Sequence, residues 1–451
     1  MHIVIIGLGA IGKTILKSLS EEEHKITIID ENKEKIEALI EKYDVFGVVG
    51  NGACMDIQKE AGVADADLVI VLTVSDELNI LACLVAKKLG AKNTIVRVRN
   101  PDYRKQIGKM KDDLGISMVV NPERETASEI FSLINLPSIV QIERFAKGKV
   151  LLVEIIAEKG CSLIGETLVS LGKKLTTKVL ICAVQRGDDV IIPSGNFRIN
   201  EGDNIHFTTD AETIGDFLSE VNLFKSPLKN IMIIGGSRIG YYLANALSKK
   251  KYFVKLIESN RSNAKELAEL LPHATVICGN GTQHDLLIEE GLEAMDVFVS
   301  LTDIDEENIV ASMFANKKKV QKSITKIKSE DLYDMLKELG INNHVSPQHI
   351  ASGRIIGYIR ALSNARGSNV LNLYRLVNNR IEALEFAAKK HENIYDKPLK
   401  ELNVKSGCLI ACIIRESEVI IPNGDSVIKL GDNVVVVTSH KNFDDLTDVF
   451  E

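Results

Sequence analysis

Tryptophan is absent from this 451-residue sequence, and aromatic residues make up only 5% of it. Side chains on which nucleic-acid bases could stack are therefore scarce. The net charge is −7, and acidic and basic residues are interspersed, so the basic surface that nucleic acid requires is missing as well. We expect a protein that binds no nucleic acid.

Long apolar runs and cysteine pairs are also missing. No run approaches the roughly 18 apolar residues that a membrane-spanning helix needs, and Met1 leads directly into an apolar stretch, which leaves no room for a secretory signal. The seven cysteines include no C-x-x-C pair. An odd number of such residues is typical of reduced thiols in a cytosolic protein and argues against a disulfide set or a metal site. We therefore expect a soluble, cytoplasmic protein of several domains.

Three glycines follow the first apolar run in "IVIIGLGAIGKTIL" at 3–16. Gly7 permits a tight turn, Gly9 has no Cβ to block a pyrophosphate, and Gly12 lets the next helix lie close to the strand. Free N–H groups at the start of that helix attract phosphates. The second apolar run ends in Asp30, where a carboxylate can bind an adenosine ribose and repel a 2′-phosphate. This pattern favours NAD or ATP over NADP.

The chain contains an internal repeat, because four segments recur at an offset of 228 or 229 residues. The first members of the pairs are "IVIIGLGAIGKTILKSL" (3–19), "GNG" (50–52), "LTVSDELN" (72–79) and "VIIPSG" (190–195). Their counterparts are "IMIIGGSRIGYYLANAL" (231–247), "GNG" (279–281), "LTDIDEEN" (301–308) and "VIIPNG" (419–424). Two copies of one composite unit therefore make up the protein.

Each copy begins with apolar runs that alternate with helical patterns, which is typical of a doubly wound α/β domain with a parallel sheet. In copy 1 the expected strands are 3–6, 26–30, 45–49, 68–73, 94–98 and 118–120. After Pro137 the pattern becomes β-rich, with hairpin turns. We predict two tandem Rossmann-like domains, each followed by a small β-rich α+β lobe. The expected boundaries are 1–136, 140–222, 229–362 and 370–451.

Ligands of open α/β sheets bind at the carboxyl ends of the strands. Thr73 and Val74 lie at the carboxyl end of the fourth expected strand and could line this crevice, whereas Asp76, Glu77 and Asn79 are expected to cap the following helix.

Arg97 ends the fifth expected strand, where a cation can face phosphates; the alternative is a surface salt bridge. Lys326 occupies the same place in copy 2. Asn51, in the first "GNG", could approach an adenine ring or only form a turn, and Asn280 is its counterpart. The amphipathic segment 121–134 could pack on its own domain or on an equivalent helix of a partner.

No catalytic arrangement accompanies the nucleotide fingerprint. A dehydrogenase needs a proton donor or acceptor beside the nicotinamide and a domain that holds the substrate. The sequence indicates neither, and it has no G-x-x-x-x-G-K-[ST] loop for ATP hydrolysis. A protein that senses a nucleotide is therefore favoured. An NAD-dependent oxidoreductase is the alternative, and a redox-sensing transcription regulator would need a basic winged helix that the sequence lacks.

The segments "IVIIGLGAIG", "GNG", "TVSDELN", "VRVRNP" and "VIIPSG…EGD", in a duplicated chain, resemble the TrkA family of Trk potassium-uptake regulatory proteins. The resemblance covers essentially the whole chain and implies tandem RCK (regulator of potassium conductance) domains. It further implies a peripheral protein on the cytoplasmic face of the cell membrane that binds NAD(H), with ATP or ADP as further ligands. Such a protein forms a ring beneath a Trk-type membrane potassium channel or transporter subunit, and we expect a homo-tetramer.

The candidate nucleotide-binding residues lie at matching positions of the two copies. They are Gly7, Leu8, Gly9, Ala10, Ile11, Gly12, Asp30, Asn51, Thr73, Val74 and Arg97 in copy 1, and Gly235, Gly236, Ser237, Arg238, Ile239, Gly240, Glu258, Asn280, Thr302 and Lys326 in copy 2. Copy 2 has Ser237 in place of Gly9 and Arg238 in place of Ala10, so we expect the two sites to differ. The sequence leaves open which nucleotide activates, which ion is coupled to transport, and whether the lobes bind a cation or second messenger.

Overall fold

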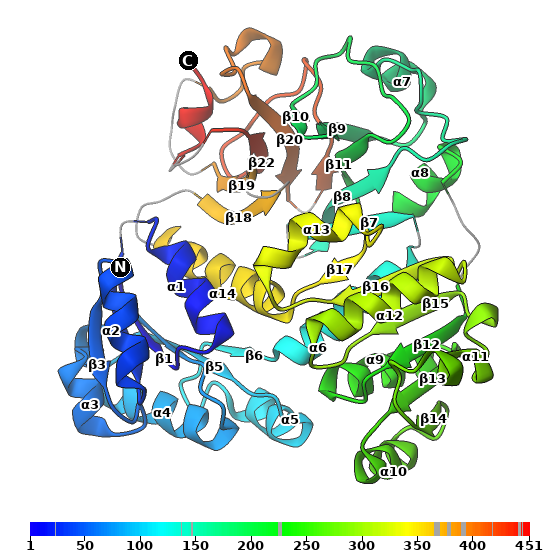
Figure 1. The fold of residues 1–451 in the computed structure, drawn as a ribbon. Helices are drawn as coiled ribbons and strands as arrows, with labels where there is room; N and C mark the ends of the chain where they lie inside the picture. Colours follow the sequence, from blue (N-terminus) through cyan, green and yellow to red (C-terminus); the bar gives the residue numbers. More distant parts are fainter. Residues whose placement is uncertain are drawn as a thin grey trace. The chain divides into compact units, whose positions relative to one another are not determined.

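The computed structural model describes the chain except for residues 23, 137, 146–147, 224–227, 365–369, 377–379, 389–393, 417, 441–442 and 444 (Figure 1). The chain forms two compact units. Unit 1 comprises Met1–Phe131 and Asn230–Ile359, and unit 2 comprises the remaining residues, 132–229 and 360–451. The two Rossmann-like segments therefore share one unit, and the two lobes share the other. The four boundaries expected from the sequence stay predictions, and Pro137 lies outside the described residues.

The Rossmann-like domain of copy 1 is built on a six-stranded parallel sheet of order β3-β2-β1-β4-β5-β6. Its strands are β1 (His2–Ile6), β2 (Lys25–Asp30), β3 (Phe46–Val49), β4 (Leu68–Val71), β5 (Asn93–Arg97) and β6 (Met118–Val120). All four residues of β4 are apolar and buried, as expected for a strand covered by helices on both faces. The strand order reverses between β1 and β4, which places the ligand crevice at their carboxyl ends. This sheet confirms the predicted fold class.

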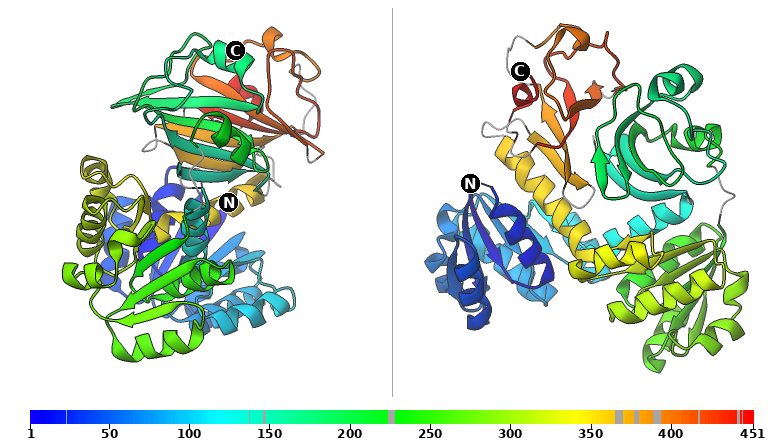
Figure 2. Two further views of the ribbon diagram at one scale, coloured as in Figure 1. Left: turned by 90° about the vertical axis from the view of Figure 1, so that its right-hand side faces the viewer. Right: turned by 45° about the horizontal axis from the view of Figure 1, so that its top comes forward.

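Helices lie against the faces of this sheet (Figure 2). They are α1 (Ala10–Leu19), α2 (Lys33–Lys42), α3 (Met55–Glu60), α4 (Asp76–Leu89) and α5 (Pro101–Met110), and α6 (Pro122–Asn135) leads from the end of β6 toward copy 2 (Figure 1). Helix α1 buries Ile11, Ile15, Leu16 and Leu19, whose spacing forms one apolar stripe. This stripe fixes the helix on the sheet with its N-terminus at the carboxyl end of β1.

Copy 2 repeats this arrangement with the strand order β14-β13-β12-β15-β16-β17. The strands are β12 (Asn230–Ile234), β13 (Phe253–Glu258), β14 (Thr275–Cys278), β15 (Val297–Ser300), β16 (Lys322–Lys326) and β17 (His344–Val345). The helices are α9 (Arg238–Lys249), α10 (Arg261–Leu270), α11 (His284–Glu289), α12 (Asp305–Lys317), α13 (Tyr333–Glu338) and α14 (Pro347–Asn364).

Within unit 1 the two copies meet through equivalent helices. Glu125 on α6 and Arg354 on α14 occupy the same position of the repeat, and Nη1 of Arg354 lies 2.7 Å from Oε1 of Glu125. Burial raises the pKa of Glu125, although the charge of Arg354 opposes this effect. Tyr242 of α9 also donates a hydrogen bond to the carbonyl oxygen of Arg99, at 3.2 Å. Helix α6 thus meets the equivalent helix of the other copy, and the ring of Phe131 on α6 also lies against that of Tyr252 of copy 2.

Unit 2 contains two antiparallel sheets, of order β10-β9-β11-β8-β7 and β18-β19-β22-β20-β21. The first lobe contains β7 (Ile139–Phe145), β8 (Val150–Ile156), β9 (Val179–Arg186), β10 (Asp189–Ile191), β11 (Asn204–Asp210), α7 (Leu168–Lys174) and α8 (Ile214–Glu220). The second contains β18 (Val370–Leu376), β19 (Ile381–Ala387), β20 (Cys408–Arg415), β21 (Glu418–Ile420) and β22 (Asn433–Thr438). Residues of both lobes, among them Cys182 and Cys412, form one apolar cluster.

Each lobe contains the same ion pair, in which the aspartate is buried and the arginine is partly exposed. Arg186 binds Asp203 through two hydrogen bonds of 2.8 Å, and Arg415 binds Asp432 in the same way. Burial alone would raise the pKa of Asp203, but the hydrogen bonds from Arg186 and from the backbone lower it overall. This pair holds the end of β9 against the turn that precedes β11.

We expect Asp203→Asn to lower the free energy of unfolding by about 2 kcal/mol at pH 7, because it removes a charged partner of two hydrogen bonds. Since the folded-state pKa of Asp203 is lowered, its contribution is complete above the unfolded pKa of about 3.9 and is lost as pH falls through the folded pKa. Urea unfolding followed by circular dichroism between pH 7 and pH 3 checks this. Asp425→Asn, in the exposed pair with Lys400, is the control and should change stability by less than about 1 kcal/mol. Equal losses in both variants would contradict the prediction.

Candidate functional site

The glycine-rich loop of copy 1 joins β1 to α1. Gly7 has a φ of +95°, and a Cβ there would lie 2.9 Å from the backbone of Thr73. A Cβ on Gly12 would overlap the carbonyl oxygen of Gly7, whereas one on Gly9 would meet no described atom within 4 Å. Helix α1 has no acidic residue in its first turn and no side-chain cap. Its N-terminal N–H groups therefore lie beside open space, which suits an anion.

Asp30 lies at the end of β2, beside this loop. Its Oδ2 accepts a hydrogen bond from the N–H of Leu8 at 2.8 Å, and its Oδ1 accepts one from the N–H of Asn32 at 3.0 Å. Lys35 Nζ lies 4.0 Å from the same carboxylate. Asp30 thus positions the glycine-rich loop, and its contact with a ribose stays a prediction.

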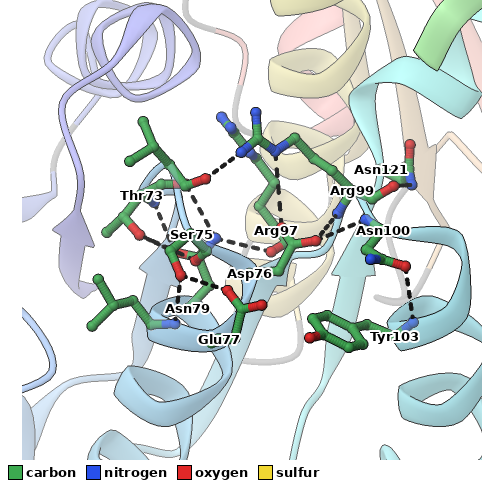
Figure 3. A network of polar contacts seen from close by, with 12 residues as sticks. Thr73, Ser75, Asp76, Glu77, Asn79, Arg97, Arg99, Asn100, Tyr103 and Asn121 are labelled. Atoms are coloured by element: carbon green, nitrogen blue, oxygen red, sulfur yellow. Dashed lines mark hydrogen bonds and ion pairs between the residues drawn. The ribbon is translucent and has the colours of Figure 1, made fainter. Parts of the chain in front are cut away.

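A polar network joins the carboxyl ends of β4 and β5 (Figure 3). Asn79 is fully buried, and its Oδ1 accepts hydrogen bonds from the N–H and hydroxyl of Thr73, at 2.8 and 2.6 Å. Its Nδ2 donates to the carbonyl oxygen of Arg97 at 3.0 Å. The expectation that Asn79 caps α4 is therefore wrong, because the cap is Ser75, whose hydroxyl accepts from the N–H of Leu78.

Asp76 holds the loop that follows β5. Its Oδ2 accepts hydrogen bonds from the N–H groups of Arg99 and Asn100, at 2.9 and 2.7 Å, so the capping expectation is wrong for this residue as well. Glu77 accepts a hydrogen bond from the hydroxyl of the cap residue Ser75. One signal could have identified these roles. The spacing Thr73, Asp76, Asn79 recurs as Thr302, Asp305, Asn308, and a cap alone does not require three polar residues at matching places.

Arg97 and Val74 lie near this network. The side chain of Val74 is 79% exposed, and its carbonyl oxygen accepts a hydrogen bond from Arg99. Arg97 is partly buried, and its Nε has no hydrogen-bond partner among the described residues. Burial and the charges of Arg99 and Arg238 lower the pKa of Arg97. These surroundings differ from those of an exposed salt bridge and leave Arg97 available to an anion.

The glycine-rich loop of copy 2 is bound more tightly by its own residues. Glu258 is 9% exposed, and its carboxylate accepts hydrogen bonds from the N–H groups of Gly236 and Asn260, at 2.8 and 2.6 Å. Asn263 donates to the carbonyl oxygen of Gly236 at 3.1 Å. The buried hydroxyl of Ser237, by contrast, has no partner in the described part of the chain. The two loops therefore differ, as the substitutions between them suggest.

Lys326 and Thr302 lie at the strand ends of copy 2. The buried ammonium group of Lys326 donates to the carbonyl oxygen of Leu301 at 3.2 Å and lies 3.4 Å from Asp303. Burial lowers the pKa of Lys326, against the attraction of Asp303. Asn308 accepts from the N–H of Thr302 at 2.8 Å. Lys326 is thus held within its own loop rather than facing a crevice.

Both "GNG" asparagines form local turns. Asn51 Oδ1 accepts from the N–H of Ala53 at 2.8 Å, and Asn280 Oδ1 accepts from the N–H and hydroxyl of Thr282. A Cβ on Gly52 would overlap the side chain of Ile6, which explains a glycine there. These contacts account for the turn, and an adenine contact stays a prediction.

A cavity of about 490 Å³ opens in front of the copy 1 loop. It is lined by Leu8, Gly9, Ala10, Lys13 and Lys35 of copy 1 and by Asp305, Lys328, Ser329 and Gln348 of copy 2. The cavity thus brings together three of the predicted residues with six that the sequence did not indicate. Three lysines and a helix N-terminus make the arrangement suited to a phosphate-bearing ligand.

Fold and site together define a protein of two Rossmann-type domains, each followed by a β-rich lobe. The model of the TrkA-N domain matches residues 3–122 and 231–347, and the model of the TrkA-C domain matches 152–222 and 383–451. The chain belongs to the TrkA family.

A relative agrees with this assignment, and solved structures share the fold. The chain is 33% identical over 444 residues to "Trk system potassium uptake protein TrkA homolog 1" of Methanosarcina mazei, covering 97% of both chains. It is similar in fold to the GsuK RCK domain, with 19% identity, a TM-score of 0.63, and coverage of 97% of this chain and 92% of that one. For the GsuK channel bound to NAD the identity is 18%, the TM-score 0.63 and the coverage 97% and 76%.

We expect Asn79→Leu to lower the free energy of unfolding by about 2 to 4 kcal/mol, because it leaves the buried backbone groups of Thr73 and Arg97 without partners. Thermal and urea unfolding followed by circular dichroism measure this loss. Asn308→Leu should give a similar loss, since the same bonds exist in copy 2. Asn51→Ala, in a surface turn, should cost less than about 1 kcal/mol. A loss for Asn79→Leu no larger than that control would contradict the role assigned to Asn79.

Proposed function

We propose that this protein is the nucleotide-sensing regulatory subunit of a Trk-type potassium uptake system. It binds NAD(H) and controls the opening of the membrane channel or transporter subunit. The observation that carries this proposal is the lysine-lined cavity in front of the uncapped N-terminus of α1. Family membership along nearly the whole chain and the printed name of the Methanosarcina mazei relative support the link to potassium uptake.

The copy 1 loop is the proposed NAD(H) site. Gly9 leaves open space where a pyrophosphate would approach the backbone, and Lys13 and Lys35 line the same cavity. The GsuK structure bound to NAD supports this choice of ligand. ATP and ADP carry the same adenosine and phosphates, so we propose that they compete for the site.

The proposed role is regulatory rather than enzymatic. Lys13, Lys35 and Lys328 line the cavity without histidine or tyrosine among the described residues, and in the proposed role these lysines bind phosphate rather than transfer protons. Incubation with NADH and a panel of carbonyl compounds should leave the absorbance of the reduced cofactor unchanged. Sustained protein-dependent oxidation would favour the oxidoreductase alternative.

We propose a homo-tetrameric ring that acts at the cytoplasmic face of the membrane. No helix in the described part of the chain is long and apolar enough to cross a membrane, so attachment would depend on the membrane subunit. The pairing of two Rossmann-type domains within unit 1 already resembles a dimer, and closed symmetry can combine such pairs. Light scattering with and without nucleotide tests this, and a monomer at all concentrations would contradict it.

Two glycine variants separate folding from binding. Gly9 has a φ of −73°, which alanine adopts, so Gly9→Ala should keep the melting temperature but lower NADH affinity at least about tenfold by obstructing the pyrophosphate. Gly12→Ala should lower the free energy of unfolding by about 1 to 3 kcal/mol through overlap with Gly7. Calorimetric titration and thermal unfolding of both variants measure these effects. Unchanged NADH affinity in Gly9→Ala would exclude copy 1 as the NADH site.

Potassium flux tests the whole proposal. Vesicles that contain the Trk membrane subunit should change their potassium flux when this protein and NADH are added together. Asp30→Ala should lose most of this response, because charged-group hydrogen bonds to the ribose are worth about 1.5 to 3 kcal/mol each. Glu258→Ala, the matched change in copy 2, should retain it. A potassium flux that does not change when the wild-type protein is added, at any nucleotide concentration, would overturn the regulatory function.

A further inference from the structure

Asp305, the first residue of α12, has one carboxylate oxygen without a hydrogen-bond donor among the described residues. The residue is only 8% exposed, and it lines the cavity in front of the copy 1 loop. Its Oδ2 accepts hydrogen bonds from the N–H groups of Lys328 and Ser329, at 2.8 and 2.9 Å. Its Oδ1 has no hydrogen-bond partner among the described residues. A buried acceptor without a donor is costly, so this oxygen is suited to a donor that arrives with a ligand.

The two sides of the cavity differ in charge. The copy 1 side presents the N-terminus of α1 with Lys13 and Lys35. On the copy 2 side the ammonium group of Lys328 already donates to the carbonyl oxygen of Asp303 at 2.8 Å and lies 3.4 Å from its carboxylate. On that side, Oδ1 of Asp305 is a buried acceptor without a donor among the described residues.

The difference in charge between the two sides of the cavity acts differently on two classes of nucleotide, because their covalent structures differ. In a dinucleotide such as NAD(H), a second ribose with hydroxyl groups and a carboxamide follow the pyrophosphate. In ATP or ADP, further phosphate groups follow the α-phosphate. Hydroxyl and amide groups donate hydrogen bonds to a carboxylate, whereas a phosphate close to it is repelled.

We propose that Asp305 determines the specificity of the copy 1 nucleotide site, by accepting a hydrogen bond from the hydroxyl or amide of a dinucleotide and by repelling a terminal phosphate. This inference rests on the proposed function, because it assumes that the copy 1 loop binds the phosphates. It adds a residue of copy 2 to that site and gives it a role in the choice between NAD(H) and ATP.

The chain contains a matched control for this role. Asp76 occupies the same place in copy 1, where its Oδ2 accepts from the N–H groups of Arg99 and Asn100. Its Oδ1 also has no hydrogen-bond partner among the described residues, with Arg99 Nε at 3.9 Å. The cavity in front of the copy 1 loop is lined by Asp305 and not by Asp76. Substitution of either aspartate disturbs the same backbone bonds, but only one of them changes the charge of that cavity.

The test compares Asp305→Asn with Asp76→Asn in the full chain. Calorimetric titration with NADH and with ATP gives the ratio of the two dissociation constants, and thermal unfolding gives the stability of each variant. We expect Asp305→Asn to shift the ratio at least about tenfold toward ATP. Asp76→Asn should lower the melting temperature by a similar amount and, because it disturbs the copy 1 crevice, should weaken the binding of NADH and ATP alike, so that the ratio stays unchanged. Asp305→Ser serves as a second uncharged variant if the asparagine variant fails to fold, and it should shift the ratio in the same direction.

The outcomes distinguish a failure of this inference from a failure of the proposed function. An unchanged ratio in the Asp305 variants, with normal NADH binding by the wild-type protein, overturns the specificity role and leaves the proposed function standing. An equal shift of the ratio in the Asp76 variant attributes the effect to the lost hydrogen bonds to the backbone, and it also overturns the specificity role of Asp305. A wild-type protein that binds neither nucleotide overturns the proposed function, and the inference with it.

Discussion

The crevice depends on side chains that bind backbone groups beyond the ends of the strands. The β-ladder between β4 and β5 ends at the pair Val71 and Val96, so it does not hold the residues that follow. Asn79 supplies the missing bonds to Thr73 and Arg97, and Asp76 does the same for the next loop. The same amide and carboxylate bonds occur in copy 2. Because these groups are buried, water does not replace them, and the geometry of each crevice depends on them.

The sequence predicts the fold well because its signals are local and consistent. Buried apolar runs, a glycine-rich turn and a following amphipathic helix all indicate the same Rossmann-type unit, and their repetition reveals the second copy. The roles of Asp76 and Asn79 were mistaken for a different reason. An acidic or amide residue near a helix N-terminus has the same local pattern whether it caps that helix or binds a neighbouring loop. The choice depends on the position of the loop after β5, which lies about twenty residues further along the chain.

Local sequence patterns do not predict the contacts between the two copies. Glu125 and Arg354 occupy equivalent positions and face each other. In a symmetric dimer of identical chains, a residue beside the two-fold axis meets its own copy, so a charge there would be repelled. Duplication within one chain allows the two positions to differ and to carry opposite charges. Duplication within one chain also allows Asp305, Lys328 and Gln348 of copy 2 to line the copy 1 cavity. The corresponding residues of copy 1 are not required to line a cavity of copy 2. A fingerprint search finds the glycine-rich loop but not such residues.

The two loops also satisfy their polar groups differently. In copy 2, Glu258 is one methylene longer than Asp30, and Asn263 adds a bond to the carbonyl oxygen of Gly236. Copy 1 has Lys35 at the place of Asn263, and this lysine lines the cavity instead of closing the loop. Tyr242 binds α9 to the backbone of Arg99, whereas Thr14, its counterpart on α1, donates only within its own helix. A ligand shifts a conformational equilibrium only through interactions that differ between the states. Copy 1 has fewer internal hydrogen bonds at its glycine-rich loop. A nucleotide bound there can therefore add more new interactions than one bound in copy 2.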